Sequence, residues 1–163
     1  MSAPQGTITQ EEVAAIIGRE KFLFGDVNWR EMPANSVILH ASFIVLDAEQ
    51  KTIPSLTVEL IYCEGRIKSE CKYLFTLFAL RPPRARVYQI EVVPPDKCSH
   101  RANGDNWYGP HQHFGEKAVK IEESKDLGCG DHEAWFKVFL RIAKISFSGR
   151  YLPPGSPQGD LKW

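Results

Sequence analysis

Apolar and polar residues follow one another along the chain in a pattern that predicts short strands between two helices. Thr9 and Glu12 stand three residues apart, as in a helix capping box, and apolar residues follow them at helical spacing. We therefore expect a helix over residues 10–20. A second amphipathic pattern begins after Asp131, a residue type favoured at helix N-termini. Its apolar positions form one broad stripe, which comprises Trp135, Phe136, Phe139, Leu140, Ile142 and Ala143.

Between these helices, β-branched and aromatic residues gather in short runs that predict a sheet. Turn-forming residues bound the runs, and the connections are too short to hold a helix, so neighbouring strands should pair antiparallel. The expected strands cover residues 37–46, 56–63, 72–80, 86–93 and 111–122. The polar stretch from Asp96 to Gly109 is expected to be a long loop, and such loops are often functional.

Together the elements predict one α+β domain over residues 1–148. It has an N-terminal helix, a mostly antiparallel sheet of about five strands, and a C-terminal amphipathic helix packed on one face. Residues 149–163 are rich in proline and glycine, which predicts an irregular C-terminal tail.

Composition narrows the classes of protein that the chain can belong to. Its 163 residues carry 20 Lys and Arg against 20 Asp and Glu, which argues against a surface that binds nucleic acid over its whole extent. No apolar run approaches the roughly 18 residues of a membrane span, and the first residues lack the pattern of a signal peptide. We therefore expect a cytoplasmic protein with no membrane partner. In that compartment Cys63 and Cys71, which a hairpin could bring together, are expected to be buried thiols.

Histidine is the main candidate for chemistry. The chain has five, yet His100, His111 and His113 fall within fourteen residues of one another. In an extended segment, residues two apart project to the same face, so His111 and His113 should share one space. This part of the chain is also basic, because residues 81–120 hold seven Lys and Arg against four Asp and Glu. Its arginines are candidate phosphate-binding residues: Arg81, Arg84, Arg86 and Arg101.

Three interpretations fit the histidines. In the first, two of them act as general acid and base, because imidazole titrates near neutrality, and cleavage of RNA by its own 2′-hydroxyl needs such a pair. In the second, four side chains hold a structural zinc ion at a spacing that matches no standard zinc finger; they are Cys98, His100, His111 and His113. In the third, the histidines only hydrogen-bond neighbouring groups of the fold.

Residues 64–145 resemble the small TumE-type toxins of bacterial toxin–antitoxin pairs. The resemblance rests on Glu64-Gly65-Arg66-Ile67, the segment from Asp96 to His100, Pro110-His111-Gln112-His113-Phe114-Gly115, and the closing amphipathic helix. It departs from the family at Cys98-Ser99, where a small apolar residue and Pro are usual. A looser likeness links the Pro-His-x-His strand to phage and mobile-element proteins. The resemblance implies an RNA-cleaving site built from His100, His111 and His113, with Asp96 beside them.

The leading hypothesis from the sequence is a toxin-like, metal-independent ribonuclease without a cofactor. His111 and His113 would act as acid and base, and His100 and Arg101 would hold the phosphate. Its partners would be RNA and a cognate antitoxin or other protein, with a homodimer left open. The competing hypothesis is a non-catalytic protein-binding or defence-conflict protein with a structural zinc ion on Cys98 and the three histidines.

Overall fold

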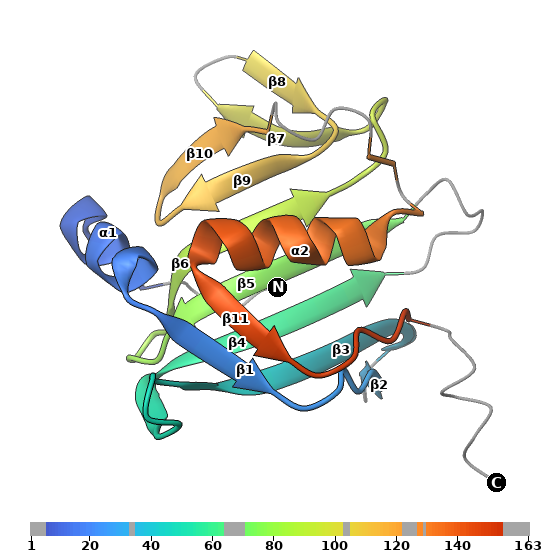
Figure 1. Cartoon of the computed structure of the whole chain (residues 1–163). Coiled ribbons are helices and arrows are strands. Elements are labelled where there is room, and N and C mark those ends of the chain that lie inside the picture. The colour runs from blue at the N-terminus through green and yellow to red at the C-terminus, as the bar shows by residue number, and fades with distance from the viewer. Residues whose placement is uncertain are drawn as a thin grey trace, which may run out of the picture.

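The computed structural model describes residues 6–32, 35–63, 71–102, 105–121, 127–128 and 130–154. Within them the chain forms two helices, one nine-stranded sheet and one separate two-stranded sheet (Figure 1). The elements are, in order, α1 (Gln10–Gly18), β1 (Lys21–Phe24), β2 (Arg30–Met32), β3 (Asn35–Leu46), β4 (Thr52–Cys63), β5 (Lys72–Ala79), β6 (Ala85–Val92), β7 (Cys98–Ala102), β8 (Asp105–Tyr108), β9 (His111–Phe114), β10 (Lys117–Lys120), α2 (His132–Ala143) and β11 (Ile145–Ser148).

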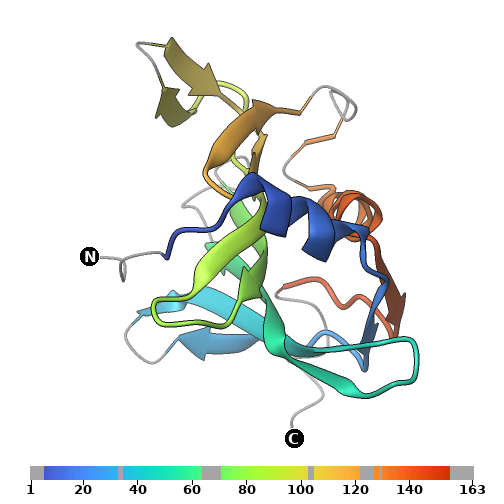
Figure 2. The same ribbon diagram turned by 90° about the vertical axis from the view of Figure 1, so that its left-hand side faces the viewer.

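The main sheet is almost entirely antiparallel. Its strand order is β10-β9-β6-β5-β4-β3-β1-β11. The short strand β2 also pairs with β3, on the same edge of β3 as β1. Among the described strands, the one parallel pair joins β1 to β11, the strand that follows α2. The β7–β8 hairpin leaves the main sheet after β6, and the chain then returns as β9 to pair with β6. Figure 2 shows this hairpin standing off the sheet beyond β9 and β10.

The predicted fold class is confirmed in its main features, but the number of strands was wrong. The α+β class, the antiparallel pairing and the C-terminal helix are present, whereas the main sheet has nine strands and not about five. The strands that the sequence did not predict have three to five residues, too few to give a repeated apolar pattern. Gly115 adopts a φ of 62° and splits the single strand expected over residues 111–122 into β9 and β10. The expected loop between Asp96 and Gly109 contains the β7–β8 hairpin.

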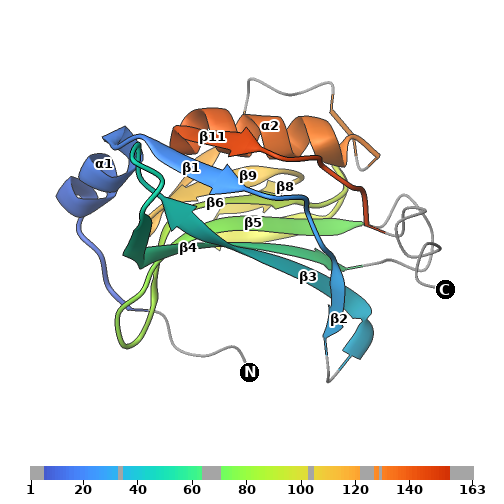
Figure 3. The same ribbon diagram turned by 60° about the horizontal axis from the view of Figure 1, so that its bottom comes forward.

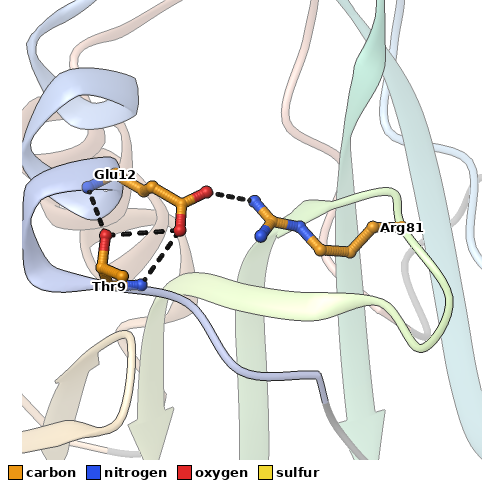
Figure 4. Close-up of polar contacts among 3 residues, drawn as sticks. All are labelled: Thr9, Glu12 and Arg81. Atoms are coloured by element: carbon orange, nitrogen blue, oxygen red, sulfur yellow. Dashed lines mark hydrogen bonds and ion pairs between the residues drawn. The ribbon is translucent and has the colours of Figure 1, made fainter.

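The N-terminal helix begins with the predicted capping box. The backbone N–H of Glu12 donates to Thr9 Oγ1 at 3.1 Å, and the backbone N–H of Thr9 donates to Glu12 Oε1 at 3.2 Å. The other carboxylate oxygen of Glu12 accepts from Arg81 Nη2 at 2.8 Å, as Figure 4 shows. Arg81 follows β5, so this ion pair ties the start of α1 to the connection between β5 and β6.

The core lies between α2 and one face of the main sheet. Figure 3 shows α2 lying over that face. The ring of Phe139 on α2 stacks on Tyr88 of β6, with their centroids 5.7 Å apart, and meets Phe75 of β5 edge to face at 6.1 Å. Four residues of the predicted stripe are buried: Trp135, Phe136, Phe139 and Ala143. Burial of aromatic area of this kind is the main force that holds such a helix to a sheet.

One of the two cysteines that were expected to be thiols differs from that expectation. Cys63 is a free, half-buried thiol whose backbone pairs with Lys72, whereas Cys71 is disulfide-bonded. Cys98 is also free. The expected turn at 64–66, Cys129 and the tail from residue 155 lie outside the described residues. In the described part of the chain, neither helix has the length and apolar character needed to cross a membrane.

Candidate functional site

The pairing of β9 with β6 creates the candidate site. His111 lies opposite Glu91 in the register, and His113 lies opposite Gln89. Register partners project to the same face of a sheet, so all four side chains share one face. Tyr88, which precedes Gln89 on β6, projects to the other face and packs on α2. The site therefore lies on the face of the sheet opposite α2.

The two histidines are buried and their rings meet. His111 is 1% exposed and His113 is 4% exposed, while Glu91 is half-buried. The Nε2 atoms of the two imidazoles lie 2.9 Å apart, and one ligand atom from each of Glu91, His111 and His113 lies within 4.8 Å of the other two. The shared space predicted for His111 and His113 is thus present, and Glu91 also borders it.

Aromatic and basic side chains from the neighbouring hairpins surround the imidazoles. The indole of Trp107, on β8, meets the ring of His111 edge to face with centroids 6.1 Å apart. Lys120 of β10 places its ammonium group 5.7 Å from the centre of the Trp107 ring. The β7–β8 hairpin and β10 therefore both contribute to the surroundings of His111.

A network of polar side chains continues from the site across the same face. Gln89 donates from Nε2 to the hydroxyl of Thr76 at 2.7 Å and accepts at Oε1 from Arg86 Nη1 at 3.2 Å. Arg86 also donates from Nε to the carbonyl oxygen of Gly115 at 3.2 Å. Burial lowers the pKa of Arg86, and the negative charge of Glu91 opposes that shift. These bonds hold Gln89 in place between Thr76 and its register partner His113.

Most of the other predicted site residues lie elsewhere. Arg81 is bound to Glu12, and Arg84 is bound to Glu59 at 3.1 Å and lies over the ring of Phe78. Arg84 precedes Glu91 by seven residues, a distance of about 23 Å along an extended strand. The structure therefore does not bring Arg81 or Arg84 to the histidines, whereas Arg86 joins the network beside them.

The rest of the predicted set comes from the segment between β6 and β8. Asp96 and Arg101 are exposed, and Cys98 is half-buried on β7. The backbone of His100 pairs with Trp107, but the side chain of His100 lies outside the described residues. Among the described residues, Glu91 and not Cys98 is the third group that meets His111 and His113.

The spacing of the ligand atoms suits a metal ion. Two nitrogen ligands of a tetrahedral zinc ion, each at 2.0–2.1 Å from the metal, lie about 3.3 Å apart. The Nε2 atoms of His111 and His113 are 2.9 Å apart, so both need to separate by only a few tenths of an ångström to hold an ion. Two imidazoles and one carboxylate are a ligand set that first-row transition metals commonly occupy.

Without a metal, the same contact is a hydrogen bond between two imidazoles. One Nε2 atom then donates and the other accepts, so the pair holds one proton between the two rings. This arrangement is also compatible with transfer of a proton, the chemistry expected from the sequence.

Sequence reasoning missed Glu91. It stands in a strand of apolar residues, and only its polar neighbour two residues earlier, Gln89, marks that face of β6 as unusual. The role of Glu91 depends on the pairing of β6 with β9, and nineteen residues separate it from His111 along the chain.

Comparison with known protein families, with characterised proteins and with solved structures finds no match for this chain. The likeness to TumE-type toxins therefore rests on the sequence motifs alone.

Proposed function

We propose that the protein binds one divalent transition-metal ion through Glu91, His111 and His113, and that the ion activates a water molecule for hydrolysis. The observation that carries this proposal is the convergence of three ligand atoms within 4.8 Å, two of them from buried histidines. Zinc fits best, because neutral imidazole nitrogen and carboxylate oxygen are among its usual ligands.

The number of ligands favours a reactive site over a structural one. Structural zinc sites are usually closed by four protein ligands, whereas catalytic sites keep three protein ligands and leave one position for water. Two histidines and one glutamate form such a three-ligand set. Since Glu91 is half-buried and both histidines are buried, the carboxylate side of the site is the side open to water.

Gln89, Thr76 and Arg86 would act as positioning residues for the ion. Partners behind the ligands of a metal site hold those ligands in the orientation that binding requires. The 2.7 Å bond between Gln89 and Thr76 fixes the side chain opposite His113. The cation of Arg86 lies in the same network and limits the excess negative charge that Glu91 brings to this face.

Measurement of Zn²⁺ binding to the purified protein tests the proposal directly. The protein is stripped with a chelator and titrated with Zn²⁺ by calorimetry, with one ion per chain as the expected stoichiometry. Each of His111→Ala, His113→Ala and Glu91→Gln is expected to weaken binding at least about tenfold, the loss typical of a disrupted metal site. Absence of stoichiometric binding in the folded wild-type protein would refute the proposal.

Two matched substitutions serve as controls for the metal titration. His40→Gln removes a half-buried histidine four strands away from β9, about 19 Å across the sheet. Glu49→Gln removes a carboxylate that is ion-paired with Lys51 on the surface. Both variants should bind Zn²⁺ as the wild-type protein does, and circular dichroism shows whether each ligand variant remains folded.

Metal-independent cleavage of RNA is the second candidate, and the hydrogen bond between His111 and His113 is the observation that favours it. This candidate function predicts that chelator-treated protein cleaves RNA and that His111→Ala abolishes the cleavage. Added Zn²⁺ should inhibit it, because the ion would occupy the Nε2 atoms of both histidines. Cleavage only after addition of metal would assign the activity to the metal site.

A cognate antitoxin and a homodimer stay predictions. Co-purification with the product of a neighbouring gene tests the antitoxin, and light scattering tests the homodimer.

A further inference from the structure

A break in strand pairing lies along one edge of β3, far from the histidine site. On this edge β2 pairs with β3 up to His40, and β1 pairs with it only at Leu46. The chain between β1 and β2 turns away, because the backbone N–H of Gly25 donates to Ser148 at the end of β11 and that of Val27 donates to Arg150, which follows β11. Residues 41–45 of β3 therefore have a described strand partner on the β4 side alone.

A small polar cavity occupies this break. Its volume is about 180 Å³, and its lining residues are Asn28, Arg30, His40, Ala41 and Ser42. Arg30 and His40 are register partners, and Ser42 lies two residues further along β3, so their three side chains share one face. The cavity is smaller than the roughly 300–1,000 Å³ of sites for drug-sized ligands, which limits its occupant to a small group.

Arg30 and His40 hold binding capacity that the other described residues do not use. Among them, no carboxylate forms an ion pair with Arg30. The Nδ1 atom of His40 is buried and has no hydrogen-bond partner in the described part of the chain. A buried polar atom left in this state costs about 1–3 kcal/mol, which favours a shift of the imidazole that presents this nitrogen to a ligand in the cavity.

Two carboxylates near the cavity are bound by other arginines, and Glu31, next to Arg30 on β2, projects to the other face of that strand. Glu59 is the register partner of Ser42 and projects to the same face, but Arg84 binds it at 3.1 Å. Asp26, which precedes Asn28 in the same connection, is bound by Arg150 at 2.8 Å. The charge of Arg30 is therefore left to act on an external anion.

We propose that this cavity binds a tetrahedral oxyanion of the phosphate type, either inorganic phosphate or a terminal phosphate group. The guanidinium of Arg30 donates in a planar fork that matches two oxygens of such an anion. His40 and Ser42 add donors from two further side chains, which suits an anion with four oxygens better than a planar carboxylate. The site is independent of the proposed metal centre, because it shares no residue with it.

Calorimetric titration of the full-length, metal-free protein with inorganic phosphate at low ionic strength tests the site. We expect saturable binding of one phosphate per chain, with sulfate competing and acetate binding more weakly. Arg30→Gln is expected to weaken phosphate binding at least about tenfold, as loss of a charged hydrogen-bonded pair does. His40→Gln is expected to weaken it as well, and a glucose phosphate ester in place of free phosphate shows whether a terminal group enters the cavity.

Lys137→Gln is the matched control, because it removes one positive charge from an exposed position on α2. It should leave phosphate binding unchanged. The proposal is overturned if the wild-type protein shows no saturable binding, if Arg30→Gln and Lys137→Gln weaken it equally, or if acetate binds more tightly than phosphate. Because the titration contains no metal, its result does not depend on the metal proposal.

Discussion

Lys21 caps the C-terminal end of α1 from within the protein, and its replacement by methionine provides a quantitative test of how that end is stabilised. The Lys21 side chain is fully buried, and its ammonium group donates to the carbonyl oxygens of Ile16 at 2.6 Å and Ile17 at 3.2 Å, and to that of Arg19. Helices leave their last carbonyls without an internal partner, so the lysine supplies donors that the helix lacks. Methionine keeps the apolar stem and removes every donor.

At pH 10.5 we expect Lys21→Met to lower the free energy of unfolding by about 1–3 kcal/mol, the cost of carbonyls left without a buried partner. At pH 7 the loss should be smaller, because methionine also removes the cost of burying a charged ammonium group. The difference should grow in alkali. Burial, with Lys144 and Arg19 nearby, lowers the pKa of Lys21 from 10.5 to about 8. Between these values the unfolded chain holds the proton and the folded chain does not, so the stability of the wild-type protein relative to the variant rises with pH. The shift corresponds to at most about 3 kcal/mol.

Urea unfolding of both proteins from pH 7 to pH 10.5 measures this difference directly. Other groups that titrate in this range affect both proteins and cancel in the comparison. Lys51→Met, which removes an exposed lysine, should follow the wild-type curve at every pH. A difference between the wild-type protein and Lys21→Met that stays constant across the range would refute the proposed titration, and equal stability at pH 10.5 would refute the capping role.

Three further substitutions test local structure by thermal or urea unfolding. Thr9→Ala removes the N-terminal cap of α1 and should lower the free energy of unfolding by about 1 kcal/mol. Thr9→Ser keeps a hydroxyl at this position and should leave the stability close to that of the wild-type protein. Phe139→Ala empties the space between α2 and the sheet, where the side chain is fully buried, and should cost about 3–5 kcal/mol. Gly115→Ala should lower the free energy of unfolding by more than about 1 kcal/mol, because φ is 62° and the new Cβ would lie 3.0 Å from Val13. For Thr9→Ala, Phe139→Ala or Gly115→Ala, an unchanged melting temperature would contradict the role stated for that residue.

Elements that carry their own pattern were predictable from the sequence. The capping box at Thr9 and the stripe that contains Phe139 depend on residues three or four apart, and both helices lie where these patterns placed them. The central strands β3 to β6 are also present, with ends within a few residues of the expected ones. In contrast, β1 and β11 have four residues each and owe their existence to each other, since Lys21 pairs with Ile145 across more than a hundred residues.

The candidate site shows the same division between local and distant information. His111 and His113 lie two residues apart on one strand, so their shared direction followed from the geometry of an extended chain. The expected strands at residues 86–93 and 111–122 follow one another and were expected to pair, but their register was not predictable from the sequence. That register places Glu91 opposite His111. Without it the two histidines lack their carboxylate, which favours acid–base chemistry over a metal ligand set.

The arginines of residues 81–120 also show that contacts between distant parts of the chain decide which groups form a site. Residues 81–120 hold an excess of basic residues, which suggested a basic pocket around the histidines. In the folded chain Glu12 and Glu59, both from outside that segment, neutralise Arg81 and Arg84, and half-buried Arg86 is directed to Gln89 and a carbonyl oxygen. Arg30 forms no ion pair among the described residues and borders a cavity, in a part of the sequence where no local charge excess marks it. Attraction of an anion depends on which cations remain uncompensated after folding, and at the edge of β3 Arg30 meets that criterion.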